Sequence, residues 1–351
     1  MKSQKSSSKA TRPNILGMTA PGFARILEGL GFRPFRAGQV FEWVYRKKVL
    51  SFGDMSNISL KLRKELEENF TLSIPEIIRR EKSSDGTVKY LIEMGDGEKV
   101  ESALIPHGRR LTLCLSTQAG CRFGCLFCAS GASGFGRNLE AYEITGQYLA
   151  VSGSCGRRIT NIVFMGVGEP LDNFEALMTA VDVLSDPAGP ALGKRKISVS
   201  TCGIAPGIRE LTRINPGIGL SVSLHSADPE KRKVLVPVTR KYPLKELKEA
   251  LREFTGKCRY PVSLEYILIS GFNVLPEDGA KLADFCKGIR AKVNLIPCNP
   301  SSVKKFTPPD EKELAGFLSE LDRRGIFYSM RRPRGRDISA ACGQLRYRAG
   351  S

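Results

Sequence analysis

The first part of the chain alternates apolar and charged residues at helical spacing. From about Ala20 to Phe70, apolar positions recur on one helical face in FARILEGLGF, QVFEWVYRKKVL and SLKLRKELEENF. This pattern predicts a small helical accessory domain over residues 19–74. The preceding residues, 1–18, are polar and basic, and we expect them to form a disordered arm.

The periodicity then changes from helical to alternating. The dipeptide Asp85-Gly86 and a second glycine-rich turn at residues 95–97 enclose an alternating run over residues 87–94. Turn dipeptides of this kind, placed beside an alternating run, are typical of β-hairpins. Residues 75–106 are therefore predicted to be a β-hairpin that links the helical domain to the rest of the chain.

From about residue 107, short β-rich runs alternate with helical stretches, which is typical of parallel β/α units. The strand candidates are residues 111–117, 158–166, 196–202, 219–225, 262–270 and 292–297. The helix candidates begin near Glu140, Asn173, Gly207, Pro243 and Pro276, and a last one spans Pro309 to Arg324. This alternation predicts an α/β fold with a partial (β/α)6 TIM-like barrel over residues 107–335. A C-terminal tail over residues 336–351 follows it.

Composition adds a class of partner to this architecture. The chain has 351 residues, with 54 Lys and Arg against 36 Asp and Glu, and a formal net charge of +18. Such a balance favours a polyanionic partner, above all nucleic acid, although a basic surface that is merely solvated has the same composition. The basic helical residues Arg46, Lys47 and Lys48 allow both interpretations. The sequence has neither an apolar membrane span nor a secretory signal, so we expect a cytoplasmic protein.

The ten cysteines are unevenly distributed along the chain. Because the cytoplasm keeps thiols reduced, this number does not indicate a disulfide scaffold. Six cysteines are scattered, and isolated cysteines usually act as small buried hydrophobic residues. The other four crowd into one short segment and need a chemical explanation. They are Cys114, Cys121, Cys125 and Cys128.

The segment CRFGCLFC places Cys121, Cys125 and Cys128 just after the first predicted barrel strand, where barrel enzymes build their active sites. Three soft thiolates favour an iron–sulfur cluster or zinc. Structural zinc usually takes four ligands, and no fourth Cys or His stands nearby, since Cys114 belongs to the preceding strand. Three ligands leave one iron of a [4Fe–4S] cube open to a small molecule. The spacing therefore favours one [4Fe–4S] cluster with an exchangeable position.

CRFGCLFC, with Phe127 before its last cysteine, resembles the CxxxCxxC motif of radical S-adenosylmethionine (SAM) enzymes. In those enzymes the open iron binds the amino and carboxylate groups of SAM. Further segments are similar to one family among them, the dual-specificity RNA methyltransferases of the RlmN/Cfr type, over most of the chain from about Gly31 to Arg346. The matching segments are VESALIP, LCLSTQAGCRFGCLFCASG, FMGVGEPLDN, VSTCGIAPGI, SVSLHSA, LIPCNP and RGRDISAACGQL.

The resemblance implies a SAM site at the ends of the predicted strands. The glycines of MGVGEP let the backbone come close to a ligand, and Glu169 is suited to the cationic amino group of SAM. On sequence alone, His225 could equally be a core histidine. The positions that match SAM contacts of the family are Gly168, Glu169, Ser200, Ser223, Leu224, His225 and Asn299.

Three more residues match catalytic positions of the family. Cys342 matches the cysteine that carries the methyl group, and the arginines close before it would favour its reactive thiolate form. Cys114 matches the resolving thiol, which forms a transient disulfide with the carrier. Glu101 matches a glutamate proposed to remove the ring proton, a role that requires hydrogen-bond reach. Without the resemblance, Glu101 is an ordinary strand carboxylate and Cys342 an inert thiol.

The resemblance also implies a reaction and its partners. Adenine C2 is electron-poor and has no lone pair for a methyl cation, so a radical route is needed. One SAM methylates Cys342, and a second is cleaved reductively to a 5′-deoxyadenosyl radical that activates this methyl group. The implied substrates are an adenine in the peptidyl transferase centre of 23S rRNA (nucleotide 2503) and one beside the tRNA anticodon (nucleotide 37). A flavodoxin or ferredoxin would supply electrons to a monomeric enzyme with no membrane partner.

Two alternatives stay open at this level. Related enzymes that methylate adenine C8 and confer ribosomal antibiotic resistance share these motifs, although Pro170 and Pro297 look more like the C2 type. A non-catalytic iron–sulfur protein that binds RNA or transfers electrons would also explain the charge and the cluster. That alternative leaves Glu169, Cys114 and Cys342 without a role.

Overall fold

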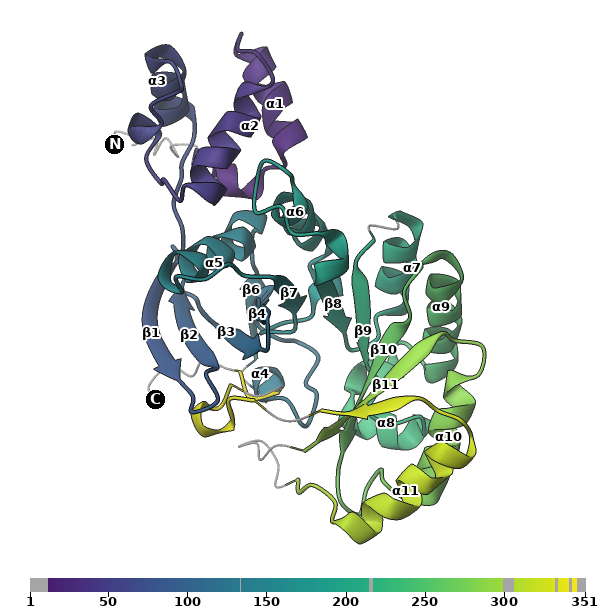
Figure 1. Ribbon diagram of the computed structural model, residues 1–351. Coiled ribbons are helices and arrows are strands. Elements are labelled where there is room, and N and C mark those ends of the chain that lie inside the picture. The colour runs from purple at the N-terminus through teal and green to yellow at the C-terminus, as the bar shows by residue number, and fades with distance from the viewer. Residues whose placement is uncertain are drawn as a thin grey trace, which may run out of the picture.

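A ten-stranded sheet forms the centre of the computed structural model, which describes residues 12–132, 134–214, 217–298, 306–331, 334–340 and 343–345. The strand order is β1-β2-β3-β4-β7-β8-β9-β10-β11-β12 (Figure 1). The strands are β1 (Glu76–Lys82), β2 (Val88–Glu93), β3 (Lys99–His107), β4 (Arg110–Cys114), β7 (Asn161–Phe164), β8 (Ile197–Thr201), β9 (Gly219–Ser223), β10 (Val262–Leu268), β11 (Ala291–Pro297) and β12 (Tyr328–Met330). A separate small sheet pairs β5 (Gln118–Gly120) with β6 (Phe135–Asn138).

Strand β4 and strands β7 to β12 all pair in parallel. Helices between them pack on the outside of the curved sheet, with α5 against α6, α7 against α9, and α10 against α11 (Figure 1). These helices are α5 (Ala141–Ser154), α6 (Phe174–Ser185), α7 (Ala205–Ile214), α9 (Leu244–Lys257), α10 (Pro276–Cys286) and α11 (Glu311–Arg323). Two short helices, α4 (Ala129–Ala132) and α8 (Pro229–Leu235), lie in loops. The predicted α/β partial barrel is confirmed: its six strands are present, and the short β12 follows them.

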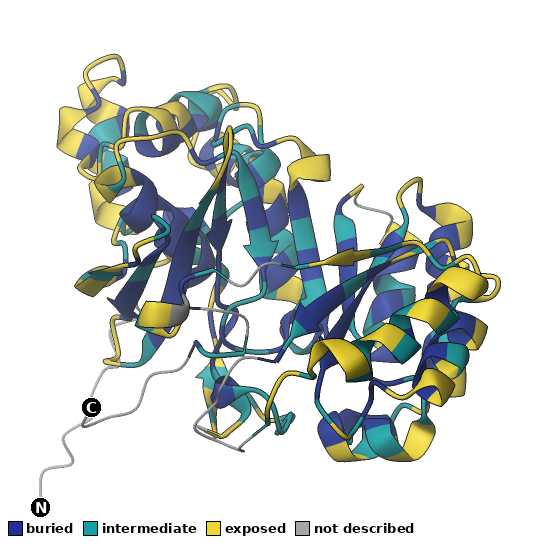
Figure 2. Cartoon of the chain, turned by 60° about the horizontal axis from the view of Figure 1, so that its bottom comes forward, coloured by how far each residue is buried: buried dark blue, intermediate teal, exposed yellow. Residues whose placement is uncertain are grey.

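The parallel strands other than β12 are largely buried, because helices cover one face and the barrel interior fills the other. In β10, the sequence VSLEYIL is buried at every position except Ser263, which is half-buried. The Tyr266 ring packs against Phe317 of α11, with ring centroids 5.5 Å apart. Figure 2 shows the same division, with the central strands mostly buried and the helices exposed on their outer faces. This rigid core fixes the ends of the strands in space.

The predicted hairpin region continues the main sheet. Strands β1, β2 and β3 form an antiparallel meander, and β3 pairs with β4. In this last pairing, Ala103 lies opposite Cys114. The meander therefore extends the barrel sheet at one edge and fixes Cys114 and the strand that carries Glu101 relative to each other.

Three helices near the N-terminus pack around a shared aromatic core. They are α1 (Ala20–Gly29), α2 (Arg36–Phe41) and α3 (Leu60–Asn69). Thr19 caps α1 by accepting a hydrogen bond from the Gly22 N–H at 3.2 Å, and the buried Phe23 ring contacts Phe41 and Phe70. The buried Thr145 hydroxyl of α5 donates to the Leu16 carbonyl at 2.8 Å. The helical part is thus attached to the barrel through one continuous apolar core.

Candidate active site

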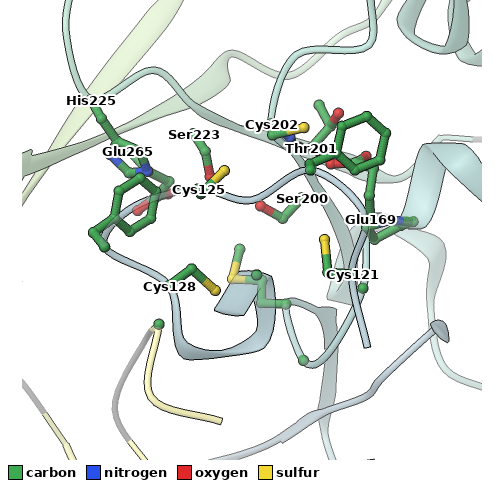
Figure 3. A pocket seen from close by; sticks show the side chains of 18 of the residues that line it. Cys121, Cys125, Cys128, Glu169, Ser200, Thr201, Cys202, Ser223, His225 and Glu265 are labelled. Carbon is green, nitrogen blue, oxygen red and sulfur yellow. Dashed lines mark hydrogen bonds between the residues drawn. The ribbon is translucent and has the colours of Figure 1, made fainter. Parts of the chain in front are cut away.

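A cavity of about 970 Å³, including its open mouth, lies at the C-terminal ends of the parallel strands. This is the end at which barrel enzymes bind their substrates. Residues at or just after the ends of five strands line it: Phe164, Ser200, Thr201, Ser223, Ile267 and Ile296. In Figure 3, the three close cysteines stand around this cavity, with Glu169 at one end and His225 at the other. The sequence therefore brings its cysteine motif and its expected SAM residues to one place.

The cysteine loop is held by its own backbone. Cys121 N–H donates to the Gly134 carbonyl at 2.7 Å, and Leu126 N–H donates to Leu235 at the end of α8 at 3.1 Å. Just before the loop, Gly120 has a φ of +79°, and a Cβ there would stand 2.1 Å from the Gly134 oxygen. Only glycine fits such a position. The loop shape thus depends on the close approach of β5 and β6.

The donor set of the cavity suits an iron–sulfur cluster better than a single ion. Cys121, Cys125 and Cys128 all line the cavity. Among the described residues, no three His, Cys, Asp or Glu side chains converge closely enough to hold one metal ion. A [4Fe–4S] cube takes one thiolate at each of its irons, so three thiols around one cavity can hold it at three corners. Burial raises the pKa of Cys121 to about 12 and that of Cys125 well above its usual value, so these thiols need a bound metal to lose their protons.

Glu169 presents a buried carboxylate to the cavity. Its Oε1 accepts from the Leu171 N–H at 3.1 Å, and its Oε2 accepts from the Cys202 N–H at 2.7 Å. Burial raises the pKa of this carboxyl group. The preceding Gly168 has a φ of +104°, and a Cβ there would stand 2.6 Å from the Gln118 Cβ. This backbone shape fixes the carboxylate, which is suited to a cationic ligand group.

His225 follows β9 in a left-handed conformation, with a φ of +57° that is uncommon for a residue other than glycine. Its Nδ1 accepts from the Ile267 N–H at 3.1 Å, and its ring packs edge-on against Phe127 of the cysteine loop at 4.3 Å. Burial, and next the Arg232 charge, lowers the pKa of His225 to about 3. The imidazole is therefore neutral, and its Nε2 carries the proton and can act as a donor.

Three other residues that we expected to bind SAM lie near the ends of β8 and β9. Ser223 lines the cavity, as does Ser200 at the end of β8. The Leu224 side chain is fully buried, and its N–H donates to the Glu265 carbonyl at 3.0 Å. Asn299 lies outside the described residues.

Arg232 of α8 is a fully buried guanidinium beneath the cavity. It donates to backbone carbonyls after β8 and at the end of β9, at 2.7 Å to Cys202, 3.1 Å to Ser223 and 3.0 Å to Leu224. Its fourth partner is the Thr239 hydroxyl at 2.5 Å. Burial lowers its pKa to about 10, so it stays charged at neutral pH. This side chain joins the ends of two strands and places a positive charge near the cysteine loop.

Glu101 and Cys114 lie on the neighbouring strands β3 and β4, outside the described lining of the cavity. Glu101 is buried, and its Oε1 lies 3.2 Å from the Lys89 ammonium. Cys114 is buried opposite Ala103, and Ala103 is two residues from Glu101 on the same strand. Because side chains alternate along a strand, Glu101 and Cys114 project from the same face of the sheet.

The described parts of the C-terminal tail contact the end of the cysteine loop and the buried cluster around Cys114. Cys342 itself lies outside the described residues. Gly343 lines the cavity, and its carbonyl accepts from the Ala129 N–H at 2.7 Å, directly after Cys128. Ala340 and Leu345 pack with Cys114 in a small buried cluster. The residues on either side of 342 are thus fixed near the cavity and near Cys114.

The residues of this site that sequence reasoning missed include Thr201, Cys202, Arg232 and Glu265. Glu265 lines the cavity from β10, and its carboxylate accepts from Ser263 at 2.8 Å and from Asn294 at 2.6 Å. A charged residue inside an otherwise apolar strand was the available signal for it. Arg232 gave no such signal, because it stands in a helix rich in charges, PEKRKVL.

Comparisons with known proteins agree over nearly the whole chain. Residues 13–72 match the ribosomal RNA large subunit methyltransferase N-terminal domain, and residues 115–286 match the radical SAM superfamily. A probable dual-specificity RNA methyltransferase RlmN of Pelotomaculum thermopropionicum is 43% identical over 95% of this chain and 92% of its own length. The chain belongs to the RlmN family of dual-specificity radical SAM RNA methyltransferases.

Other relatives of the family agree with this assignment. A dual-specificity RNA methyltransferase RlmN of Syntrophobacter fumaroxidans is also 43% identical, over 94% of this chain and 97% of its own length. The crystal structure of a radical SAM methyltransferase from Sphaerobacter thermophilus superposes with a TM-score of 0.89. It is 38% identical and covers 95% of this chain and 99% of its own.

Membership makes this protein a radical SAM methyltransferase that acts on RNA. It implies a [4Fe–4S] cluster and SAM as cofactors. Within the part of the chain that the structure describes, the helices are too short or too polar to cross a membrane.

Proposed function

We propose that this enzyme methylates adenine C2 in 23S rRNA, at nucleotide 2503, and in tRNA, at nucleotide 37, with Cys342 as the methyl carrier. The observation that carries the proposal is the anchoring of the described tail residues at two sites. Gly343 is held beside the cysteine loop, and Ala340 and Leu345 pack with Cys114. The methyl-carrying cysteine must be activated near the cluster and SAM, and it must later be released from the RNA by a second thiol. A tail held both beside the cysteine loop and beside Cys114 suits these two steps.

Cys121, Cys125 and Cys128 would hold the cluster. Glu169, His225, Ser200 and Ser223 would bind SAM, with Gly168, Leu224 and Asn299 beside them. The buried Glu169 carboxylate is matched to the ammonium group of SAM, and the neutral His225 can donate from Nε2. Cluster and SAM together would supply a 5′-deoxyadenosyl radical, the species needed to take hydrogen from a methyl group that a base cannot deprotonate.

Cys342, as a thiolate, takes a methyl group from the SAM sulfonium by displacement. After hydrogen removal, the methylene carbon on the Cys342 sulfur bonds to adenine C2, and the enzyme is joined to the RNA. This adduct is a radical, and as its C2 proton leaves it would also give up one electron, for which the cluster would be the acceptor. Cys114 then attacks the Cys342 sulfur. The S–S bond forms as the C–S bond breaks, and the released carbon takes a proton and becomes the new methyl group. The disulfide is a transient one that reductants reopen.

Glu101 would remove the C2 proton from the adduct. Its Oε1 lies 3.2 Å from the Lys89 ammonium, and a carboxylate oxygen is the kind of group that can accept the proton. Its place on the same sheet face as Cys114 suits a base that acts just before that thiol.

RNA would bind through the basic surface and the helical accessory domain over residues 19–74. A flavodoxin or ferredoxin would provide electrons, and we propose a monomeric enzyme in the cytoplasm. The C2 position rests on the family resemblance at Pro170 and Pro297, and the related C8 reaction is the alternative to exclude.

The test is anaerobic turnover of the reconstituted protein with reductant, SAM and an unmodified 23S rRNA fragment or tRNA. The RNA is then digested, and its nucleosides are identified by mass spectrometry. We expect 2-methyladenosine. If 8-methyladenosine forms, the regiochemistry is wrong while the cysteine roles stand. If SAM is cleaved without methylation, the proposed RNA substrate is wrong.

A further inference from the structure

Two carboxylates join the C-terminal tail to the turn between β1 and β2. Asp337 of the tail accepts from the Ser83 hydroxyl at 2.6 Å and from the Ser84 N–H at 3.0 Å. In the opposite direction, Asp85 of the turn accepts from the tail at the Gly335 N–H, at 2.9 Å. Each segment therefore supplies a carboxylate to donors of the other.

The contact is shaped at the backbone as well. Gly335 has a φ of +63°, and a Cβ there would stand 2.8 Å from the Ala340 Cβ and 3.0 Å from the Thr87 Cγ2. Its carbonyl accepts from the Ala340 N–H at 2.8 Å, which folds residues 335–340 into a tight loop. A larger residue at 335 would separate the tail from the turn.

Both carboxylates are stabilised in their charged form. Burial opposes ionisation of Asp85, yet hydrogen bonds from Thr87 and the Gly335 N–H lower its pKa to about 2. Hydrogen bonds from Ser83 and the Ser84 N–H lower the pKa of Asp337. For a carboxyl group with a depressed folded pKa, the stabilisation is complete above the unfolded pKa and is lost only as the pH falls toward the folded one. The contact therefore persists at neutral pH.

A second anchor holds the tail beyond residue 342. The Gly343 carbonyl accepts from the Ala129 N–H at 2.7 Å, and the Leu345 carbonyl accepts from the Ser130 hydroxyl at 2.5 Å. These donors directly follow Cys128 of the cysteine loop. The two anchors thus stand on different supports, the β1–β2 turn before residue 342 and the cysteine loop after it.

We infer that Ser83, Asp85 and Asp337 form a clasp that positions the tail for methyl transfer. The inference rests on the proposed function, in which Cys342 carries the methyl group. The turn belongs to the same meander as Lys89 and Glu101, so the clasp connects the tail to the support of the proposed base. These three are positioning residues, since the described structure places them outside the cavity lining.

The test compares Asp337→Asn, Ser83→Ala and the double variant with the wild-type full-length enzyme. The matched control is Asp96→Asn in the next turn of the meander, where Asp96 accepts from the Glu98 N–H at 3.1 Å and pairs with Arg137. Three quantities are measured: 5′-deoxyadenosine formed per methylated adenosine, iron content, and hydrogen exchange of the peptide that spans the tail.

We expect Asp337→Asn to raise the ratio of deoxyadenosine to methylated adenosine by about five- to tenfold, the size of one net hydrogen bond at an exposed position. Exchange in the tail should rise, while iron content and SAM cleavage without RNA stay at wild-type levels. Because Ser83 and Asp337 act through one contact, the double variant should show little more than the Asp337 variant. The Asp96 control should keep the wild-type ratio.

An unchanged ratio with faster tail exchange would overturn the inference, because the contact would then be structural only. Unchanged exchange would overturn it as well. The proposed function fails separately, in the wild type, if no methyl group is found on the Cys342 peptide after incubation with SAM. In that case the exchange result still decides whether the clasp holds the tail.

Discussion

At the scale of single residues, Glu169 carries a charge that its surroundings make costly. Burial raises its pKa, and two backbone N–H groups are its closest partners among the described residues. A cationic ligand would restore the charge balance. We expect Glu169→Gln to weaken SAM binding by about tenfold or more, since a charged hydrogen bond is lost. Equilibrium binding of SAM to the reconstituted protein measures this, with the exposed Glu175→Gln as the control that should bind normally.

Cys114 gives a prediction about an intermediate. With Cys114→Ala, the carbon bond to adenine can form but the C–S bond to Cys342 has no thiol to break it. We therefore expect a covalent enzyme–RNA adduct, visible as a slowly migrating band on a denaturing gel. Replacing the buried Cys202 with Ala should give no such band. Normal release of product from the Cys114 variant would contradict the role given to this thiol.

His225 predicts a dependence of stability on pH. Its pKa is about 3 in the folded protein, below the unfolded value of about 6.5, so the unfolded chain binds more protons between these values. Stability is complete above pH 6.5 and falls as the pH drops. In His225→Gln, an amide oxygen can accept from Ile267 without titrating. Between about pH 7 and 5.5, wild type should lose on the order of 1 kcal/mol more unfolding free energy than this variant in urea titrations. Equal losses would show that His225 is not buried and neutral.

At the scale of elements, the pairing of β5 with β6 predicts which glycine variants keep the iron–sulfur cluster and which lose it. In Gly120→Ala, the new Cβ would overlap the Gly134 carbonyl, and the cysteine loop between these strands must shift. We expect most of the iron to be lost after reconstitution, measured as iron and sulfide per chain. Gly124→Ala is the matched control, since Gly124 also has a positive φ but a Cβ added there would meet no heavy atom within 4 Å. That variant should keep its iron at a strain cost of about 1–2 kcal/mol.

Elements with strong local signals could be predicted from the sequence. The six longer parallel strands are apolar runs between turn residues, and helix α11 begins with a capping box between Asp310 and Glu313. Strand β12 was missed because Tyr328–Met330 is short and largely exposed. The pairing of β3 with β4 was missed for a different reason, since strand pairing beyond a hairpin depends on tertiary contacts. The candidate site divides in the same way: motif residues such as Cys121 were visible, whereas Arg232 acts through backbone atoms that no pattern encodes.

At the scale of the whole molecule, the charge of +18 predicts how RNA binds. Phosphate contacts release counterions, so affinity for the 23S rRNA fragment should fall about a hundredfold or more between roughly 50 and 200 mM salt. SAM cleavage without RNA should change little over the same range, because it involves no contact with RNA phosphates. Filter binding and a deoxyadenosine assay measure the two quantities. If the affinity for the rRNA fragment did not change with salt, the basic surface would be solvated and would not contact RNA phosphates.

The position of Arg232 has a consequence for the order in which the site forms during synthesis of the chain. The three cysteines of the loop leave the ribosome long before Thr239, the last partner of this guanidinium. Leu235, which holds Leu126 of the loop, also emerges late. Until then the thiols belong to a nascent chain in which the contacts of Arg232 and Leu235 have not yet formed. We therefore expect stable cluster binding only after α8 has been synthesised, and a pause in translation before it would leave the thiols open to oxidation.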